Sequence, residues 1–252
     1  MTRRLNVRFG NFGDTLMEDN LYLLFPTPIV RIPATEDNYN QSQIEVKRAI
    51  EDIEASGDTS TVTYNYGAKK DTPIGAKTYD FIEKYKCKNL KERITDATYK
   101  YLDKISWSGS RTFEIRNSWI NIADTDEDNT QHCHPGYTIS GTYYFRVNEK
   151  QGAICFHNPN VVTHAGNFPQ GTVCPQTTNI VPDDGDILLF PSWLTHSVKK
   201  NRSQEQRISV AFNIDIVSDD SIAFGLIKQN AVPQHPTIHS TKTIIQELKN
   251  EN

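Results

Sequence analysis

The periodicity of hydrophobic and polar positions differs before and after residue 110. Between Gln41 and Ala55, apolar residues recur at roughly helical spacing with charges between them, which predicts a helix that covers a sheet. A similar pattern from Thr78 to Ile105 predicts one or two further helices, broken near Cys87. Ahead of them, Leu21 to Ile32 indicates an edge strand interrupted by its prolines.

From Thr112 onward the chain becomes a series of short β-like runs divided by turns. These runs are rich in β-branched and aromatic residues, as strands are. The predicted strands are Phe113 to Ile122, Thr138 to Val147, Gly152 to Phe156, Asp186 to Phe190 and Arg207 to Ile216. The segments Gly57 to Ile74 and Val161 to Thr178 have no clear period and are expected to be loops near the substrate.

This order of elements predicts an α+β, mainly β fold, a double-stranded β-helix or jelly-roll. Residues 1–110 would supply the first strand and supporting helices packed on one sheet, residues 111–216 the jelly-roll core, and residues 217–252 a C-terminal extension with a helix at Thr241 to Leu248. At 252 residues, we expect one domain over 1–252.

Charge and cysteine content exclude several classes of protein. A net charge of −4 and the absence of a dense Lys/Arg stripe argue against nucleic acid as a partner. The sequence has no apolar run of membrane-spanning length and no leader-like segment behind its basic N-terminus. Its four cysteines show no CxxC spacing, so we expect a protein of the reducing cytoplasm, without disulfides or a membrane.

The candidate chemistry lies in three histidines. His132 and His134 are separated by one residue and would share a face of an extended strand, and His196 follows a strand that ends in Phe-Pro-Ser. Three such side chains complete a facial set of metal ligands. Cys133 would point away from the metal as a small buried thiol, and His157 is not expected to be a ligand.

Strand alternation places further polar side chains beside these histidines. Arg207 shares a polar face with Ser209, Ala211 and Asn213. The small side chains next to the arginine would leave room for a ligand carboxylate that the guanidinium binds. Tyr144 would face the same interior and donate to that carboxylate. Asn117 and Asn121 alternate with Trp119 on one face and would line the pocket.

In their order along the chain, these motifs resemble those of the iron(II)/2-oxoglutarate-dependent oxygenases of double-stranded β-helix fold. The motifs are HxH, Ser-Gly-x-Tyr-Tyr, Gly-Asp-Ile-Leu-Leu-Phe-Pro-Ser-x-Leu-x-His and Arg-x-Ser. More narrowly, the chain resembles a prolyl-hydroxylase-like group of largely uncharacterised oxygenases of bacteria and tailed phages, through Leu-Phe-Pro-Thr-Pro at 24–28 and Asn-Ser-Trp-Ile-Asn at 117–121. The resemblance is densest from Asn117 to Asn213.

The resemblance implies a metal site and a cosubstrate site. His132, His134 and His196 would hold Fe(II), and Arg207 would bind 2-oxoglutarate, with Ser209, Tyr144, Asn121 and Asn117 lining the cofactor pocket. His134 stands where the wider superfamily has Asp or Glu. The third ligand is therefore either His134 itself or a carboxylate elsewhere in the chain that the motifs do not identify. With O2 as cosubstrate, the implied reaction is hydroxylation of a small molecule or peptide, with a peptidyl or free amino acid as first guess, and release of succinate and CO2. The setting would be a bacterial cell or phage-infected host, and a homodimer is one expected state of the protein.

Two other functions fit parts of the pattern. A cupin-type metal enzyme would share the fold and the histidines, but it needs a Glu after HxH and has no use for Arg207. A non-enzymatic jelly-roll that binds a partner would keep the histidines for a closed structural metal site, with tight zinc and no oxygen consumption.

Overall fold

A computed structural model describes residues 26–64, 79–160 and 175–217. The chain divides into two compact units, residues 1–108 with 113–215, and residues 109–112 with 216–252. Almost all of the second unit, including the expected helix at Thr241 to Leu248, lies outside the described residues. The fold below is that of the first unit.

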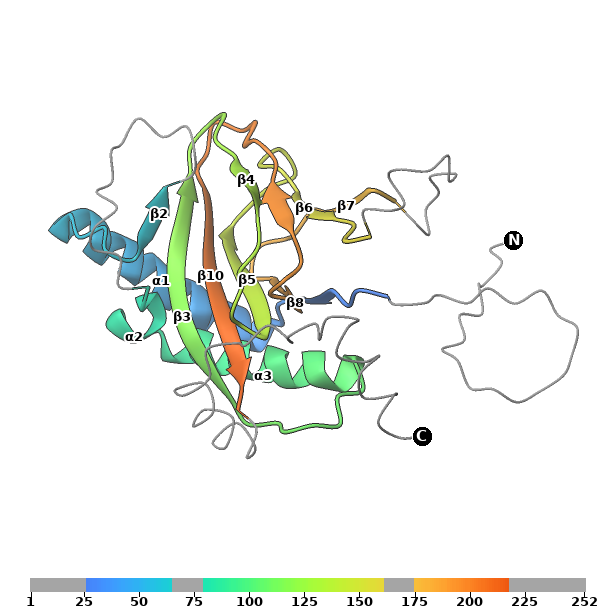
Figure 1. Cartoon of the computed structure of the whole chain (residues 1–252). Helices are drawn as coiled ribbons and strands as arrows, with labels where there is room; N and C mark the ends of the chain where they lie inside the picture. The colour runs from blue at the N-terminus through green and yellow to red at the C-terminus, as the bar shows by residue number, and fades with distance from the viewer. Residues whose placement is uncertain (1–25, 65–78, 161–174, 218–252) are drawn as a thin grey trace, which may run out of the picture. The chain divides into compact units, whose positions relative to one another are not determined.

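Two sheets form the first unit (Figure 1). The major sheet has the order β1 (Val30–Ile32), β8 (Ile187–Pro191), β5 (Ile139–Arg146), β10 (Arg207–Ile216), β3 (Phe113–Ala123) and β2 (Val62–Tyr64). The minor sheet has the order β4 (Asn129–His132), β9 (His196–Val198), β6 (Ile154–His157) and β7 (Thr177–Ile180). Except for β2 with β3 and β6 with β7, neighbouring strands in these sheets are not consecutive along the chain, as the predicted jelly-roll requires.

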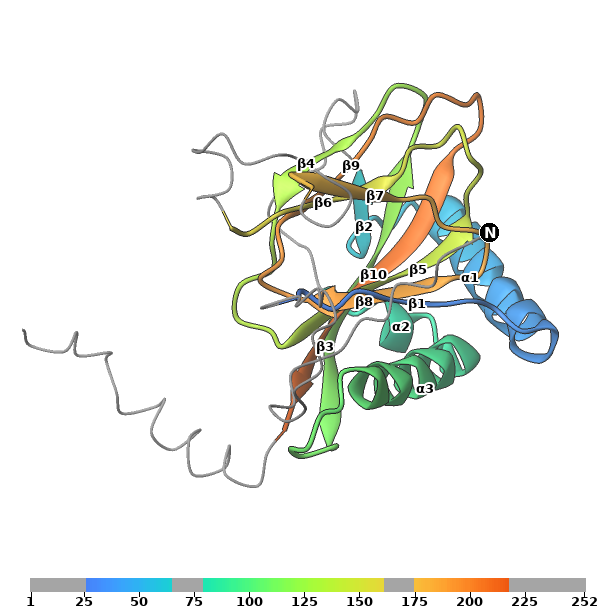
Figure 2. The ribbon, with the colours of Figure 1, turned by 90° about the vertical axis from the view of Figure 1, so that its right-hand side faces the viewer.

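Helices cover one face of the major sheet. Figure 2 shows α2 (Phe81–Lys84) and α3 (Lys88–Lys104) on that side and the minor sheet on the other. The first helix, α1 (Glu36–Ser56), packs on α3. The Glu45 carboxylate of α1 accepts the main-chain N–H groups of Asn89 and Leu90, both at 3.0 Å, and so caps the first turn of α3. No helix in the described part of the chain is long and apolar enough to cross a bilayer.

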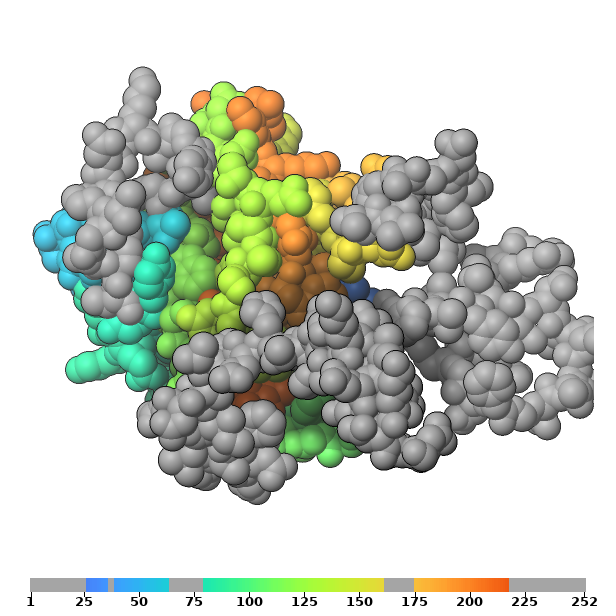
Figure 3. Space-filling view, viewed as in Figure 1, coloured from blue at the N-terminus to red at the C-terminus, as the bar shows by residue number. Residues whose placement is uncertain are grey.

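Alternation along β10 separates the core from the interior between the sheets. Ile208, Val210, Phe212 and Ile214 are at most 1% exposed and form one face of the strand. Phe212 packs against Gly141 of β5, where an added Cβ would lie 2.4 Å from the ring. The opposite face of β10 points into the cavity described below. Figure 3 shows the molecule as a space-filling view from the direction of Figure 1.

The predicted strands and helices that fall on described residues are confirmed, and four short strands were missed. All five predicted strands and the three helical segments are present, and β1 is an edge strand as expected. Four strands of three or four residues, namely β2, β4, β7 and β9, were not predicted. Because so few residues give too short an alternation to recognise, only the pairing across the sheets reveals them.

Candidate metal centre and anion pocket

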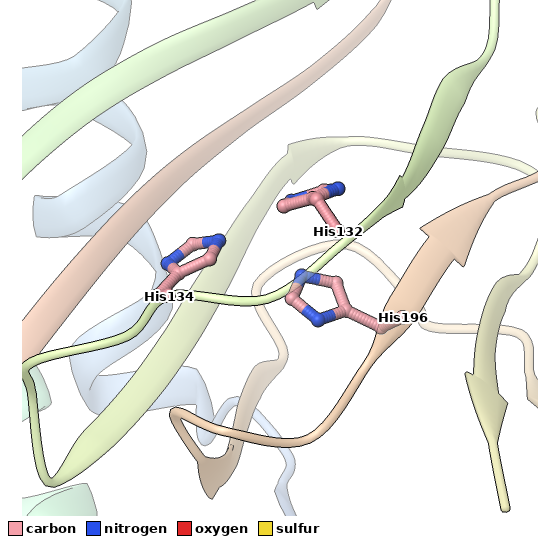
Figure 4. A group of neighbouring side chains, drawn as sticks. All are labelled: His132, His134 and His196. Carbon is pink, nitrogen blue, oxygen red and sulfur yellow. The ribbon is translucent and has the colours of Figure 1, made fainter.

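The three predicted histidines lie together, with one ring nitrogen of each within 4.8 Å of the others (Figure 4). His132 ends β4 and His196 begins β9, and antiparallel pairing places these two residues directly opposite each other. His134 follows two residues after β4, and its main-chain N–H donates to Ser192 O at 2.9 Å. The HxH pair thus lies at a strand end and in the loop beyond it, instead of on one continuous strand as expected.

Hydrogen bonds fix the tautomer of each imidazole. His132 Nδ1 donates to Thr130 O at 2.7 Å, and His196 Nδ1 donates to Leu194 O at 2.9 Å. A carbonyl oxygen can only accept, so both rings carry their proton on Nδ1 and leave the Nε2 lone pair free. His134 Nδ1 contacts Asn213 Oδ1 at 2.8 Å, and with this amide oxygen as the acceptor the ring has the same tautomer. Three Nε2 lone pairs are therefore available for one metal ion.

Burial keeps the imidazoles of His196 and His134 neutral. Desolvation lowers the pKa of His196 to about 3, against the opposing effect of its bond to Leu194 O. The ring centroid of Phe190 lies 4.8 Å from that of His196 and contributes to this apolar surrounding. Burial also lowers the pKa of His134, although the Asn213 bond favours its protonated form. Neutral imidazole is the form that binds a metal, so protons do not compete at physiological pH.

A cavity of about 470 Å³ runs from the histidines to a buried arginine. Arg207 is 5% exposed, and one guanidinium nitrogen donates to Gln151 O and, at 2.9 Å, to Lys199 O. Among the described residues, no carboxylate lies within ion-pair distance of it. Desolvation lowers the pKa of Arg207, because the buried guanidinium has lost its solvating water. An anion that enters the cavity would compensate the positive charge of this guanidinium.

Tyr144 and Ser209 line the same end of the cavity as Arg207. They are opposite each other in the pairing of β5 with β10. Burial raises the pKa of Tyr144, so its hydroxyl keeps its proton and remains a donor. Both side chains therefore lie where the alternation predicts, and their role in binding a cofactor stays a prediction.

The two predicted asparagines line the cavity but bond to protein groups. Asn121 Oδ1 accepts the indole N–H of Trp119 at 3.1 Å. Asn117 lies in a chain of hydrogen bonds between Asn213 and Tyr137. Neither Asn213 nor Tyr137 was predicted as a site residue, although the alternation placed Asn213 on the polar face of β10.

Two neighbouring residues lie apart from the metal centre. His157, as expected, is not in the histidine cluster, and its Nε2 contacts Ser197 Oγ at 3.0 Å. Cys133 is exposed, so the expectation of a buried thiol was wrong. The reason is that β4 ends at His132, so Cys133 lies in the loop beyond the strand and not on a packed strand face.

Comparison with known proteins supports the chemical interpretation of this geometry. A family model described as "Putative 2OG-Fe(II) oxygenase" matches residues 117–213, the segment that holds the three histidines and Arg207. This segment of the chain is similar to that oxygenase family. The match begins and ends at the residues between which the sequence resemblance is densest. A search of curated proteins finds no match.

A solved structure with a TM-score of 0.50 supports the fold assignment, and others are similar at lower scores. AviO1 from Streptomyces viridochromogenes Tue57 aligns with a TM-score of 0.50 at 10% identity, over 75% of this chain and 90% of that one. A prolyl-4-hydroxylase from Pseudomonas putida aligns at 0.46 and 10% identity, over 76% and 89%. An oxidoreductase of the 2OG-Fe(II) oxygenase family from Burkholderia pseudomallei aligns at 0.40 and 17% identity, over 52% and 57%. At these identities the likeness concerns the fold alone.

Proposed function

We propose that the protein is an iron(II)- and 2-oxoglutarate-dependent dioxygenase in which His132, His134 and His196 hold the metal and Arg207 anchors the cosubstrate. The observation that carries this proposal is the arrangement of three Nε2 lone pairs at one end of a cavity and a buried, carboxylate-free guanidinium at the other. A closed structural zinc site does not need the second feature.

The residues fit a ferrous ion. Three imidazoles on one side of the centre leave positions open on the cavity side, as oxygen-activating iron sites require. Each ring is oriented by a hydrogen bond at Nδ1, and metal-bound histidines generally have such a bond. In this assignment the third ligand is His134, and the ion has no anionic protein ligand.

The residues also fit 2-oxoglutarate. Between Arg207 and Asn213 the inner face of β10 carries only the small side chains Ser209 and Ala211, which leaves room for an extended dicarboxylate. Arg207 would pair with the carboxylate remote from the metal, and the Tyr144 hydroxyl would donate to it. Both groups are buried, so these bonds form in a water-poor environment where charge pairing is strong.

Iron with 2-oxoglutarate supplies the oxidising chemistry, in which one oxygen atom of O2 enters the substrate and succinate and CO2 are released. The chain's own part is to position and shield. Phe156 of the minor sheet and Phe190 of the major sheet lie beside His196 and would shield this ligand from water. The ring centroids of Trp119 and His134 are 5.5 Å apart. Trp119 lines the cavity, where it would contact an approaching substrate.

The substrate we propose is a small molecule or a peptide, with hydroxylation of a peptidyl or free amino acid as the first reaction to assay. The size of the cavity supports one such group beside 2-oxoglutarate.

Succinate formation tests the proposal. Purified protein loaded with Fe(II) should convert 2-oxoglutarate to succinate and consume O2, slowly without substrate. His134→Ala should abolish this, whereas His157→Ala, which removes a nearby histidine outside the cluster, should not. Tight zinc binding without any succinate would contradict the proposal and favour a structural metal site.

A further inference from the structure

A one-way chain of hydrogen bonds connects His134 to a tyrosine hydroxyl in the cavity. His134 Nδ1 donates to Asn213 Oδ1, Asn213 Nδ2 donates to Asn117 Oδ1, and Asn117 Nδ2 donates to Tyr137 Oη, each at 2.8 Å. Ser140 Oγ donates a second bond to Asn213 Oδ1 at 2.6 Å. Each member donates to the next, so the hydroxyl proton of Tyr137 is the donor left at the end.

This chain can run in two directions, because an asparagine side chain has an oxygen on one side and an NH2 group on the other. In the reverse direction Tyr137 donates to Asn117, and His134 accepts at Nδ1 and carries its proton on Nε2. A metal ion bound at Nε2 excludes that tautomer. Metal at His134 therefore selects the direction in which the Tyr137 proton is free for a ligand in the cavity that Tyr137 lines.

Tyr137 lies at the end of the cavity away from the cosubstrate anchor. The hydrogen-bond chain that ends at Tyr137 passes through Asn213, which lies six residues along β10 from Arg207. At about 3.3 Å per residue, roughly 20 Å separates these two positions along the strand. A 2-oxoglutarate held between the metal and Arg207 leaves the Tyr137 end for the substrate.

The charge of the cavity favours an anion at that end. Arg207 is the one charged side chain among the described residues that line it, and none of them is a carboxylate. A ferrous ion and Arg207 together carry three positive charges, and 2-oxoglutarate carries two negative charges. One positive charge therefore remains uncompensated. Because all three ligands are neutral histidines, no protein anion at the metal cancels this excess.

We propose that Tyr137 is a specificity-determining residue that donates its hydroxyl proton to a carboxylate of the substrate, with Asn213 and Asn117 as positioning residues that fix the donor direction from the metal side. This rests on the proposed function, because metal at His134 selects the direction. The substrate class is thus a carboxylate-bearing molecule, such as a free amino acid or a peptide C-terminus.

A matched pair of probes tests the proposal by binding. Phenylacetate and phenylacetamide have nearly the same shape, and only the first is an anion. Their affinities are measured by calorimetry on protein saturated with Ni(II) and 2-oxoglutarate, which performs no turnover. Wild-type protein should prefer phenylacetate by about ten-fold, the effect of a hydrogen bond to a charged group, and Tyr137→Phe should lose most of that preference.

Tyr79→Phe is the matched control, since it removes a hydroxyl from another tyrosine of the same cavity that has no part in the chain. It should keep the wild-type preference. Uptake of Ni(II) and 2-oxoglutarate by each variant verifies folding. A preference that survives in Tyr137→Phe, or that is absent from wild-type protein, overturns the assignment of Tyr137.

The same titrations of wild-type protein and Tyr137→Phe without metal separate this proposal from the proposed function. Loss of the metal charge weakens anion binding in both proteins, so the coupling is read from the part of the preference that Tyr137→Phe removes. A smaller Tyr137-dependent part without metal supports the coupling through His134, and an equal part overturns the coupling. Failure of the three histidines to take up metal would overturn the proposed function and the coupling together. The comparison of wild-type protein with Tyr137→Phe would then still decide whether Tyr137 recognises a carboxylate.

Discussion

The two sheets that enclose the cavity hold their functional side chains in different ways. In the minor sheet, His132 and His196 are oriented by main-chain carbonyls two residues earlier, those of Thr130 and Leu194. His134 is oriented by Asn213, a side chain of the major sheet. The first arrangement is built into the backbone and no substitution outside the ligands removes it. The second depends on side chains, so single substitutions can change it.

Loss of a minor-sheet ligand should have the largest effect. His196→Ala removes one of the three proposed metal ligands, and we expect metal affinity to fall by more than about 100-fold, beyond the range for loss of a group that only orients a ligand. Equilibrium dialysis with Fe(II) or Co(II) measures this. His157→Ala, a change in β6 of the same sheet, is the control and should retain metal; equal loss in both would mean that the cluster is not the site.

Arg207→Met should weaken 2-oxoglutarate binding and leave metal binding nearly unchanged. The variant removes the buried guanidinium but none of the histidines, so 2-oxoglutarate affinity should fall by about 30-fold to 100-fold, equivalent to roughly 2–3 kcal/mol for a charge-assisted pair. Metal affinity should change by less than about two-fold, since the hydrogen bonds that orient the three imidazoles are intact. Calorimetric titration of 2-oxoglutarate into Ni(II)-loaded protein measures the cosubstrate affinity, and unchanged binding would place the anchor elsewhere.

Asn213→Ala tests the difference between the sheets directly. Removing the acceptor of His134 Nδ1–H should weaken metal binding by about 10-fold to 30-fold. Thr130→Ala removes the side chain beside His132 but keeps its carbonyl acceptor, so its effect should stay within about two-fold, as for surface substitutions. If both variants bind metal alike in competition with a chelator, side-chain orientation of His134 contributes nothing.

The free energy of unfolding of the metal-free protein should decrease gradually in acid. Burial lowers the pKa of His196 from 6.5 to about 3, so between these values the unfolded chain binds more protons than the folded one. The free energy of unfolding should therefore decline as the pH falls below 6.5, by at most about 1.4 kcal/mol per pH unit from this group. Denaturant titrations at several pH values should show a flatter decline for His196→Gln, and an identical decline would contradict the assigned burial effect.

The sequence predicted the major sheet better than the minor sheet. The eight residues of β5 and the ten of β10 are long enough for alternation to show which face is core and which is cavity, so Tyr144, Ser209 and Arg207 were placed correctly. The strands β4 and β9 have four and three residues, and no period can be recognised in them. Their histidines were found from spacing and family resemblance instead.

The support of the metal centre could not be predicted at all. The acceptors Thr130 O and Leu194 O are main-chain groups, which no residue type reveals. The chain from Asn213 through Asn117 to Tyr137 joins two strands and a loop, so it exists only once the tertiary structure brings them together.

Anaerobic addition of 2-oxoglutarate to Fe(II)-loaded protein tests the central claim most directly, because a metal-to-ligand charge-transfer band in the visible range requires iron and cosubstrate in the same site. Wild-type protein should develop this band, and His134→Ala and Arg207→Met should each develop it weakly or only at much higher 2-oxoglutarate concentration. No band in iron-loaded wild-type protein, or a band that is unchanged in both variants, would contradict an iron centre formed by the three histidines with Arg207 as its anchor.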